Sequence, residues 1–169
     1  MANETKTRCL SAADFAVPVD DRYFEDYVPG SVYEYGHITI TADEIVAFAR
    51  QYDPQSFHTD PEQASSGPFG GLIASGWHTA AVCMRLFVDH YLSHVASMAS
   101  PGIDKLRWPR PVRPGDELWF RATIDAARVS NSKPDRGLVH TTAELLNSDG
   151  DLVMSLKAMN FLRRRLADV

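Results

Sequence analysis

The segment from Trp77 to about Val95 restricts the possible folds of this chain more than any other. Its pattern predicts one long helix that is apolar around most of its circumference. The apolar side chains are Ala81, Val82, Met84, Leu86, Phe87, Val88, Tyr91 and Leu92. A helix of this kind is usually enclosed by other elements rather than laid on a surface. Arg85, Asp89 and His90 interrupt its apolar stretch, which excludes a membrane span.

The second half of the chain predicts the strands that enclose this helix. Apolar and polar side chains alternate along three segments, as they do in strands with one buried face. These segments are 118–127, 138–147 and 152–159, with a turn at 148–151, and further strands are expected at 103–108 and 31–40. We therefore predict an α+β fold in which a curved antiparallel sheet wraps around a long central helix.

The size and composition of the chain fit one globular domain. Its 169 residues suffice for a single core. We place the domain at 23–169, after an N-terminal arm at 1–22 that is expected to be extended or partly disordered. The first 21 residues contain no apolar run like that of a signal peptide, which predicts a cytoplasmic protein. The net charge of −5 argues against a general nucleic-acid binder.

The spacing of cysteines and histidines predicts neither a disulfide framework nor a metal site. Cys9 and Cys83 lie far apart in the sequence, and the six histidines form no H-E-x-x-H or comparable motif. The residues around Ser75 also lack the G-x-S-x-G elbow of serine hydrolases. The sequence therefore predicts neither metal-dependent chemistry nor a serine hydrolase.

Asp53 and His58 are the strongest candidates for chemistry. The pattern from Thr41 predicts a helix that starts with a capping box and stops at Asp53, because Pro54 disfavours helical backbone before it. A spacing of five residues fits neither helix nor strand periodicity, so a loop can turn both side chains toward one point. A carboxylate and an imidazole placed in this way form a general acid–base pair. The alternative is a helix-stop signal followed by a hydrogen-bonded loop histidine.

Three segments together resemble a known family. The first runs from Asp53 to Ala64 and contains His58 and then Asp60-Pro61. The second is Ala74-Ser75-Gly76-Trp77-His78-Thr79, at the start of the long helix. The third is Pro111-Val112-Arg113-Pro114-Gly115-Asp116, before the long strands. In this order and spacing the chain resembles the MaoC-like dehydratases, the (R)-specific enoyl-CoA hydratase group of the hot-dog fold, over about 24–163.

The resemblance implies a reaction and the residues that perform it. Asp53 and His58 would activate a water molecule and return a proton, so that water is reversibly added to a trans-2-enoyl-CoA. The backbone N–H of Gly76 would bind the thioester oxygen, with Ser75 beside it in the oxyanion and substrate-binding position. Helix N-termini favour anions, which supports the role of Gly76 independently. The resemblance also implies a homodimer and no cofactor beyond coenzyme A as the carrier of the acyl group.

Two departures from the family pattern leave other functions open. Gln55-Ser56 replaces the usual Asn-Pro, and Ser75 stands where many hydratases have histidine. They leave the choice of substrate open. The alternatives to hydration are an acyl-CoA thioesterase of the same fold and a non-catalytic subunit that binds acyl thioesters.

Four basic residues follow the predicted short strand or lie within it. Lys105, Arg107, Arg110 and Arg113 place four positive charges within nine residues. Because arginine suits phosphate, these residues could contact the phosphates of coenzyme A. The competing interpretation is the solvated face of a strand.

Overall fold

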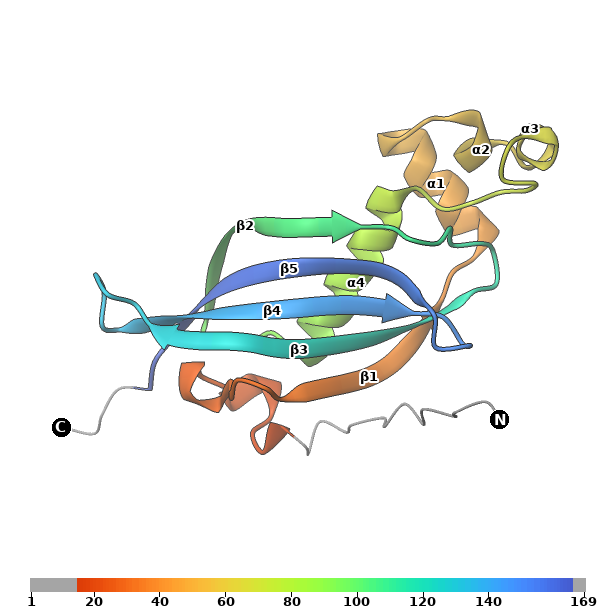
Figure 1. Ribbon diagram of the computed structural model, residues 1–169. Helices are drawn as coiled ribbons and strands as arrows, with labels where there is room; N and C mark the ends of the chain where they lie inside the picture. Colours follow the sequence, from red (N-terminus) through yellow and green to blue (C-terminus); the bar gives the residue numbers. More distant parts are fainter. Residues whose placement is uncertain (1–14, 166–169) are drawn as a thin grey trace.

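The computed structural model describes residues 15–165 and shows a curved antiparallel sheet with a long helix on its concave side (Figure 1). The sheet has five strands in the order β1-β3-β4-β5-β2. The strands are β1 (Val32–Thr39), β2 (Ser97–Arg107), β3 (Glu117–Val129), β4 (Arg136–Leu146) and β5 (Leu152–Arg163). The helices are α1 (Ala42–Tyr52), α2 (Ser56–Thr59), α3 (Pro61–Ser66) and α4 (Gly76–His90), with 3-10 turns at Val19–Asp21 and Phe24–Asp26. The predicted α+β architecture is confirmed.

The three strands with the clearest alternation form the centre of the sheet. β3 pairs with β4, and β4 pairs with β5, in antiparallel register. Leu118, Phe120 and Ile124 of β3 are at most 1% exposed, as their alternation predicts. The hairpin between β4 and β5 turns at Gly150, whose φ of +82° costs glycine no steric strain. Local sequence patterns therefore identify this part of the fold.

The edge strand β2 begins at Ser97, six residues before the predicted start at Ile103. Its pairing with β5 shifts register at three places along the strand. Each irregularity interrupts the alternation of faces, so the period-2 pattern is lost from the sequence. Pro101 within the strand is tolerated because β2 lies at the edge of the sheet.

The central helix α4 ends at His90, five residues before the predicted end at Val95. Two side chains from the N-terminal region occupy its C-terminal end. The guanidinium of Arg22 donates hydrogen bonds to the carbonyls of His90 and Tyr91, at 3.2 and 2.8 Å, and the Tyr27 hydroxyl donates to Tyr91 at 2.9 Å. These bonds satisfy carbonyls that lack an intrahelical partner at a helix end.

One side of α4 is open to solvent, so the prediction of a fully enclosed helix needs correction. The side that faces the sheet carries Val82, Cys83, Leu86 and Phe87, all at most 8% exposed. Trp77, Met84 and Val88 are 61%, 48% and 38% exposed, and with Ala81 they form what we call the exposed stripe of α4. An apolar surface of this length usually contacts another molecule.

Residues 15–22, which belong to the predicted arm, pack against the domain. The Phe15 ring stacks on Tyr33 at 4.2 Å between ring centroids and is 2% exposed. The Arg22 guanidinium lies 3.4 Å from the centroid of the Phe15 ring, and its side chain is fully buried. Residues 1–14 of the predicted arm lie outside the described residues.

Replacing Arg22 with methionine should lower the free energy of unfolding by about 3 kcal/mol or more, because buried carbonyls lose their donors. Urea unfolding would measure this loss. The matched control is Arg85→Met on the surface of α4, where the arginine side chain is 71% exposed and pairs with Asp89. The control should lose only about 0.5 kcal/mol, and equal losses in both variants would contradict this role of Arg22.

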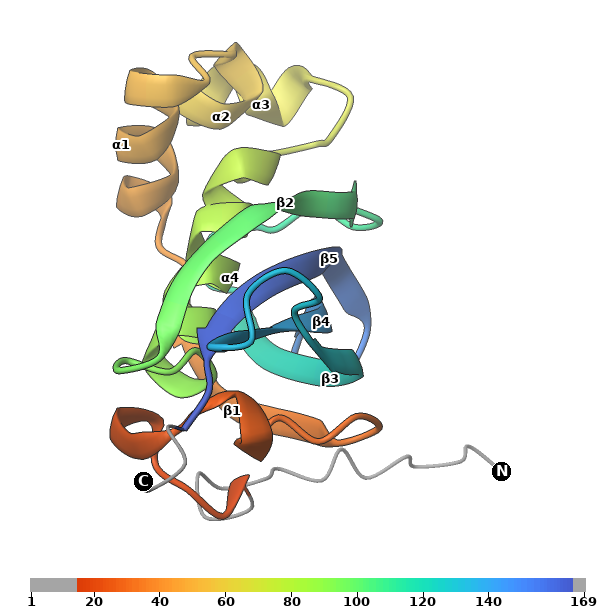
Figure 2. The same cartoon turned by 90° about the vertical axis from the view of Figure 1, so that its left-hand side faces the viewer.

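The three short helices form a separate layer at one end of the sheet. Figure 2 shows α1, α2 and α3 grouped beside the start of α4 and the end of β2. This arrangement brings the first two segments of the family resemblance to one place. None of the helices within residues 15–165 is long and apolar enough to cross a membrane.

Candidate active site

Asp53 occupies its position because α1 stops there. The helix begins with the predicted capping box, in which the Thr41 hydroxyl accepts from the Glu44 N–H and the Glu44 carboxylate accepts from the Thr41 N–H. It ends at Tyr52, and Asp53 follows as C-cap with φ −152° and ψ 68°. The predicted helix start and stop are both confirmed.

His58 lies on α2, a single helical turn where the sequence predicts a loop. The turn forms between Pro54, which cannot continue α1, and Asp60, which starts α3. The Asp60 carboxylate accepts hydrogen bonds from the N–H groups of Glu62 and Gln63, and Pro61 follows it, so Asp60 is the N-cap of α3. His58 is therefore held between two helix ends and is 5% exposed.

The structure brings Asp53 and His58 together. The distance between Nε2 of His58 and Oδ2 of Asp53 is 3.4 Å, which is longer than a direct hydrogen bond. Nδ1 of His58 lies 2.8 Å from the carbonyl oxygen of Ile73. A carbonyl can only accept, so Nδ1 carries the hydrogen. In the neutral ring Nε2 then presents its lone pair to the carboxylate, and a water molecule beside the two atoms can donate to both.

Two further side chains hold the Asp53 carboxylate. The Ser75 hydroxyl donates to Oδ2 at 2.6 Å, and the Gln55 amide donates to Oδ1 at 2.7 Å. The hydrogen bond from Ser75 is the main cause that keeps the pKa of Asp53 below its usual value; Gln55 and His58 add to this, and partial burial opposes it. Asp53 is therefore a carboxylate at neutral pH, and its side chain is 20% exposed.

Ser75 lies behind the carboxylate rather than on an open surface. It is fully buried, and it is the N-cap of α4, where its hydroxyl accepts from the Trp77 N–H at 3.2 Å. The same hydroxyl donates to Asp53. These contacts suit a residue that orients Asp53, whereas the predicted contact between Ser75 and substrate stays a prediction.

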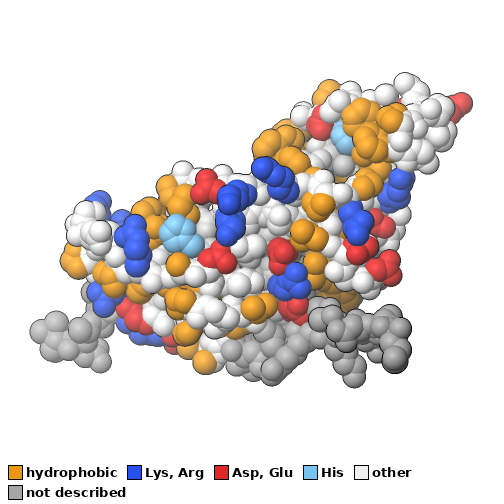
Figure 3. All heavy atoms as spheres, in the orientation of Figure 1, with side chains coloured by type: hydrophobic (Ala, Val, Ile, Leu, Met, Phe, Trp, Pro, Cys, Tyr) orange, Lys and Arg blue, Asp and Glu red, His pale blue; other side chains and the backbone are white. Residues whose placement is uncertain are grey.

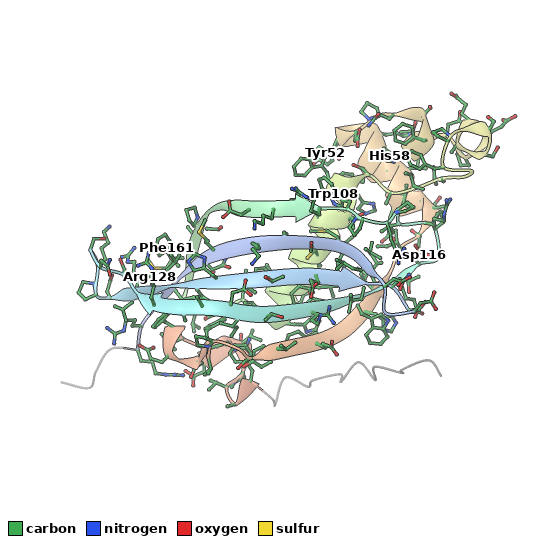
Figure 4. All side chains as sticks on the ribbon, in the orientation of Figure 1. Tyr52, His58, Trp108, Asp116, Arg128 and Phe161 are labelled. Atoms are coloured by element: carbon green, nitrogen blue, oxygen red, sulfur yellow. The ribbon has the colours of Figure 1, made fainter. Side chains whose placement is uncertain are left out.

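Gly76 is the first residue of α4, so its N–H has no acceptor within the helix. The indole of Trp108 packs directly against its Cα. A Cβ at position 76 would lie 2.8 Å from Cε2 of Trp108, closer than such atoms pack. The glycine therefore makes room for Trp108. Figure 4 shows Trp108 at the end of β2, below His58 in the helical layer.

Three of the four basic residues are directed to different partners. Arg110 forms an ion pair with Asp151 at 3.0 Å, and a terminal nitrogen of Arg113 donates to the Phe69 carbonyl at 2.6 Å. Arg107 donates to the carbonyl of Leu106, its neighbour in the chain. Lys105 has a φ of +54° within one of the irregular parts of β2. Contacts from these residues to coenzyme A phosphates stay a prediction, and the existing bonds of Arg110 and Arg113 compete with such contacts.

Large apolar side chains surround the candidate site. Tyr52 and Trp77 are 64% and 61% exposed, and Phe69 and Trp108 are each 40% exposed. Figure 3 shows hydrophobic side chains gathered over the helical layer and the neighbouring end of β2. A surface of this kind suits an apolar ligand or a second protein chain. Within residues 15–165, no group of three His, Cys, Asp or Glu side chains is placed to hold a metal ion.

Three features of the site were not identified from the sequence. Gln55 bonds Asp53 across Pro54, the Ile73 carbonyl sets the tautomer of His58, and Trp108 covers Gly76. Of these contacts, only the one from Gln55 to Asp53 joins residues close in sequence, so only this one could be expected from the local sequence. The other two depend on contacts between distant segments.

Comparisons with known proteins place this chain in a family. The model of the MaoC like domain matches residues 26–145. The MaoC-like dehydratase from Rhodospirillum rubrum is 39% identical with a TM-score of 0.78, over 86% of this chain and 99% of that protein. The 3-hydroxyacyl-thioester dehydratase Z of Mycobacterium tuberculosis is 34% identical over 66% of this chain and 75% of its own length. The (R)-hydratase PhaJ1 of Pseudomonas aeruginosa, at 22% identity and a TM-score of 0.66 over 87% of this chain and 92% of that protein, shares the fold.

The fold and these matches define a hydratase or dehydratase of the hot-dog class, which makes the chain a hydro-lyase at the level of the family. It belongs to the MaoC-like dehydratase family. The resemblance found in the sequence and the hot-dog fold that it implied are both confirmed.

Proposed function

We propose that this chain reversibly adds water to a trans-2-enoyl-CoA to give a 3-hydroxyacyl-CoA, with Asp53 and His58 as the acid–base pair. One observation carries this proposal. The Ile73 carbonyl holds His58 in the tautomer whose Nε2 lone pair faces the Asp53 carboxylate, 3.4 Å away. A water molecule beside them can donate one O–H to each acceptor and present its oxygen to a neighbouring substrate.

The reaction then follows from the arrangement of these groups. Nε2 of His58 takes a proton from water as the water oxygen forms a bond to C3. The electrons of the C2–C3 double bond move toward the thioester, whose oxygen gains enolate charge beside the Gly76 N–H at the positive end of α4. The imidazolium returns the proton to C2, and the Asp53 carboxylate stabilises the imidazolium in between. Water is added and no group on the protein is consumed.

A homodimer is part of the proposal. Trp77, Met84 and Val88 of the exposed stripe of α4 and Ile103 of β2, which is 55% exposed, give the chain an apolar surface. β2 is also an edge strand, whose free backbone groups can pair with another strand. A second copy that covers this surface would bring two candidate sites near one interface. The cytoplasmic location expected from the sequence stays a prediction.

An assay of two signals tests the reaction. Loss of the enoyl-thioester absorbance without release of free thiol is the expected result. Release of thiol while the enoyl signal persists would instead favour the thioesterase. Stabilisation of the protein by acyl thioesters of varied length and carrier, without turnover of any, would favour the non-catalytic binding subunit.

Replacing Ser75 with alanine should lower kcat by roughly 10- to 100-fold, because a hydrogen bond to a charged group is lost. Since that bond lowers the pKa of Asp53, its removal should raise this pKa and move the acid limb of the pH profile to higher pH. A lowered pKa of Asp53 stabilises the folded protein at pH values above the pKa of Asp53 in the unfolded chain. This contribution to the free energy of unfolding should be smaller in Ser75→Ala. A profile of kcat against pH would measure the shift. The control is Ser65→Ala, because the Ser65 hydroxyl donates to the Glu62 carbonyl on the exposed surface of α3. A reduced kcat with an unmoved acid limb would contradict the role of Ser75 in holding Asp53.

A further inference from the structure

Asn160 is a polar residue among the buried positions of the sheet. It lies on β5 in the alternating set of positions that face α4, and it is 7% exposed. Its Oδ1 has no hydrogen-bond partner among the described residues. A buried polar group left in this state costs about 1–3 kcal/mol. Nearly all buried polar atoms in proteins have a partner, which can be a protein group, a water molecule or a ligand.

A cavity of about 260 Å³ adjoins this amide. Its walls come from α4, β2 and β5, and none of the side chains that line it is charged. Met84 and Ile103 form its outer rim, where it opens onto the apolar surface proposed for the second copy. The Ser100 hydroxyl in its wall is already used, because it donates to the Gly102 carbonyl at 2.9 Å and accepts from the Gly102 N–H at 3.2 Å. Burial raises the pKa of the Cys83 thiol to about 12, so this group is neutral. The cavity is thus an apolar space with the Asn160 amide as its polar wall.

The cavity lies beside the later turns of α4, whose first residue belongs to the candidate site. Cys83 and Phe87 of α4 line it, and a helix rise of 1.5 Å per residue puts them about 10 to 16 Å beyond Gly76. β2 runs from this region to Trp108, which packs on Gly76. Figure 4 shows Trp108 and Phe161, the neighbour of Asn160, at opposite ends of β2. A thioester held at Gly76 would send an acyl chain of medium length toward Asn160.

We infer that the acyl group of the substrate carries a hydroxyl near its far end, and that the amide of Asn160 binds this hydroxyl. The inference rests on the proposed function, since it describes the substrate of that site. A hydroxyl both donates and accepts, which matches an amide. A carboxylate or an ammonium group is excluded, because it would enter an apolar cavity whose lining offers no opposite charge. A plain alkyl end would fill the space and leave the amide unpaired.

Two pairs of ligands test this inference. The first pair is a medium-chain trans-2-enoyl-CoA with and without a terminal hydroxyl, for which kcat/KM is measured. The second pair is the corresponding saturated acyl-CoA thioesters, whose affinity is measured by calorimetry. The wild type should prefer the hydroxylated member of each pair by about 10-fold or more, because the unpaired amide penalises the other. Asn160→Leu should reverse this preference while keeping its fold, since leucine has similar volume and needs no partner. Ser100→Ala, in the same wall, should keep the preference of the wild type.

Each result separates this inference from the proposed function. Hydration of both enoyl thioesters with equal kcat/KM, or a preference that survives in Asn160→Leu, would overturn the role of Asn160 and leave hydration intact. Preferred binding of the hydroxylated saturated thioester without turnover of either enoyl thioester would overturn hydration and support the role of Asn160. Failure to bind or turn over any of the four compounds would overturn both.

Discussion

Replacing Asp53 with asparagine, or His58 with glutamine, should lower kcat/KM for enoyl-thioester hydration by roughly 10²- to 10⁴-fold. The asparagine keeps the size of the side chain but loses the negative charge that accepts hydrogen bonds from Ser75 and Gln55. The glutamine removes the ring whose Nδ1 bonds the Ile73 carbonyl and whose Nε2 takes the proton. Steady-state rates over a range of enoyl-CoA concentrations would measure both losses.

The double variant and a matched control sharpen this test. Because the two residues act on one water molecule, the double variant should lose little more kcat/KM than the less active of the two single variants. Asp60→Asn is the control from the same segment, since asparagine is also a good N-cap and Asp60 does not contact the pair. It should keep nearly the wild-type kcat/KM. Normal turnover by a well-folded double variant would remove Asp53 and His58 from the active site.

The parts of the fold that could be predicted are those whose causes are local in sequence. The capping box at Thr41 and the stop at Asp53-Pro54 depend on a few adjacent residues, and both appear as expected. The alternation along β3 also reports its buried face directly. The end of α4 could not be found in this way, because Arg22 binds its last carbonyls from 68 residues away. The start of β2 was hidden by register shifts against β5.

The same distinction applies to the candidate site. The spacing of Asp53 and His58 identified the pair, since both belong to one short segment between two helix ends. The bond from Ser75 to Asp53 joins residues 22 positions apart, and nothing in the local sequence indicates it. The packing of Trp108 on Gly76 likewise joins distant segments and has no local signal. Sequence can therefore identify candidate groups for chemistry, while their tautomer and orientation depend on contacts formed by the whole fold.

Replacing Gly76 with alanine should lower kcat/KM by about 100-fold, because displacement of reacting groups by roughly 1 Å has an effect of this size. The new Cβ would lie 2.8 and 2.9 Å from two carbons of the Trp108 ring, so either the ring or the first turn of α4 must move. Movement of α4 would shift the Gly76 N–H and, through Ser75, the Asp53 carboxylate. The same overpacking should cost about 1–3 kcal/mol of folding free energy, which urea unfolding would measure.

Trp108→Leu provides the decisive background for this variant, since a smaller side chain leaves room for the Cβ. Gly76→Ala should therefore cost much less stability and activity in the Trp108→Leu background than in the wild type. The difference between the two effects of Gly76→Ala measures the coupling energy between these two residues in contact. If Gly76→Ala lowers kcat/KM by the same factor in both backgrounds, the space beside Gly76 serves the substrate and not the indole. Two explanations for glycine at position 76, space for the thioester and space for Trp108, thus predict different results for the double variant. Both are compatible with an N–H that binds the enolate oxygen.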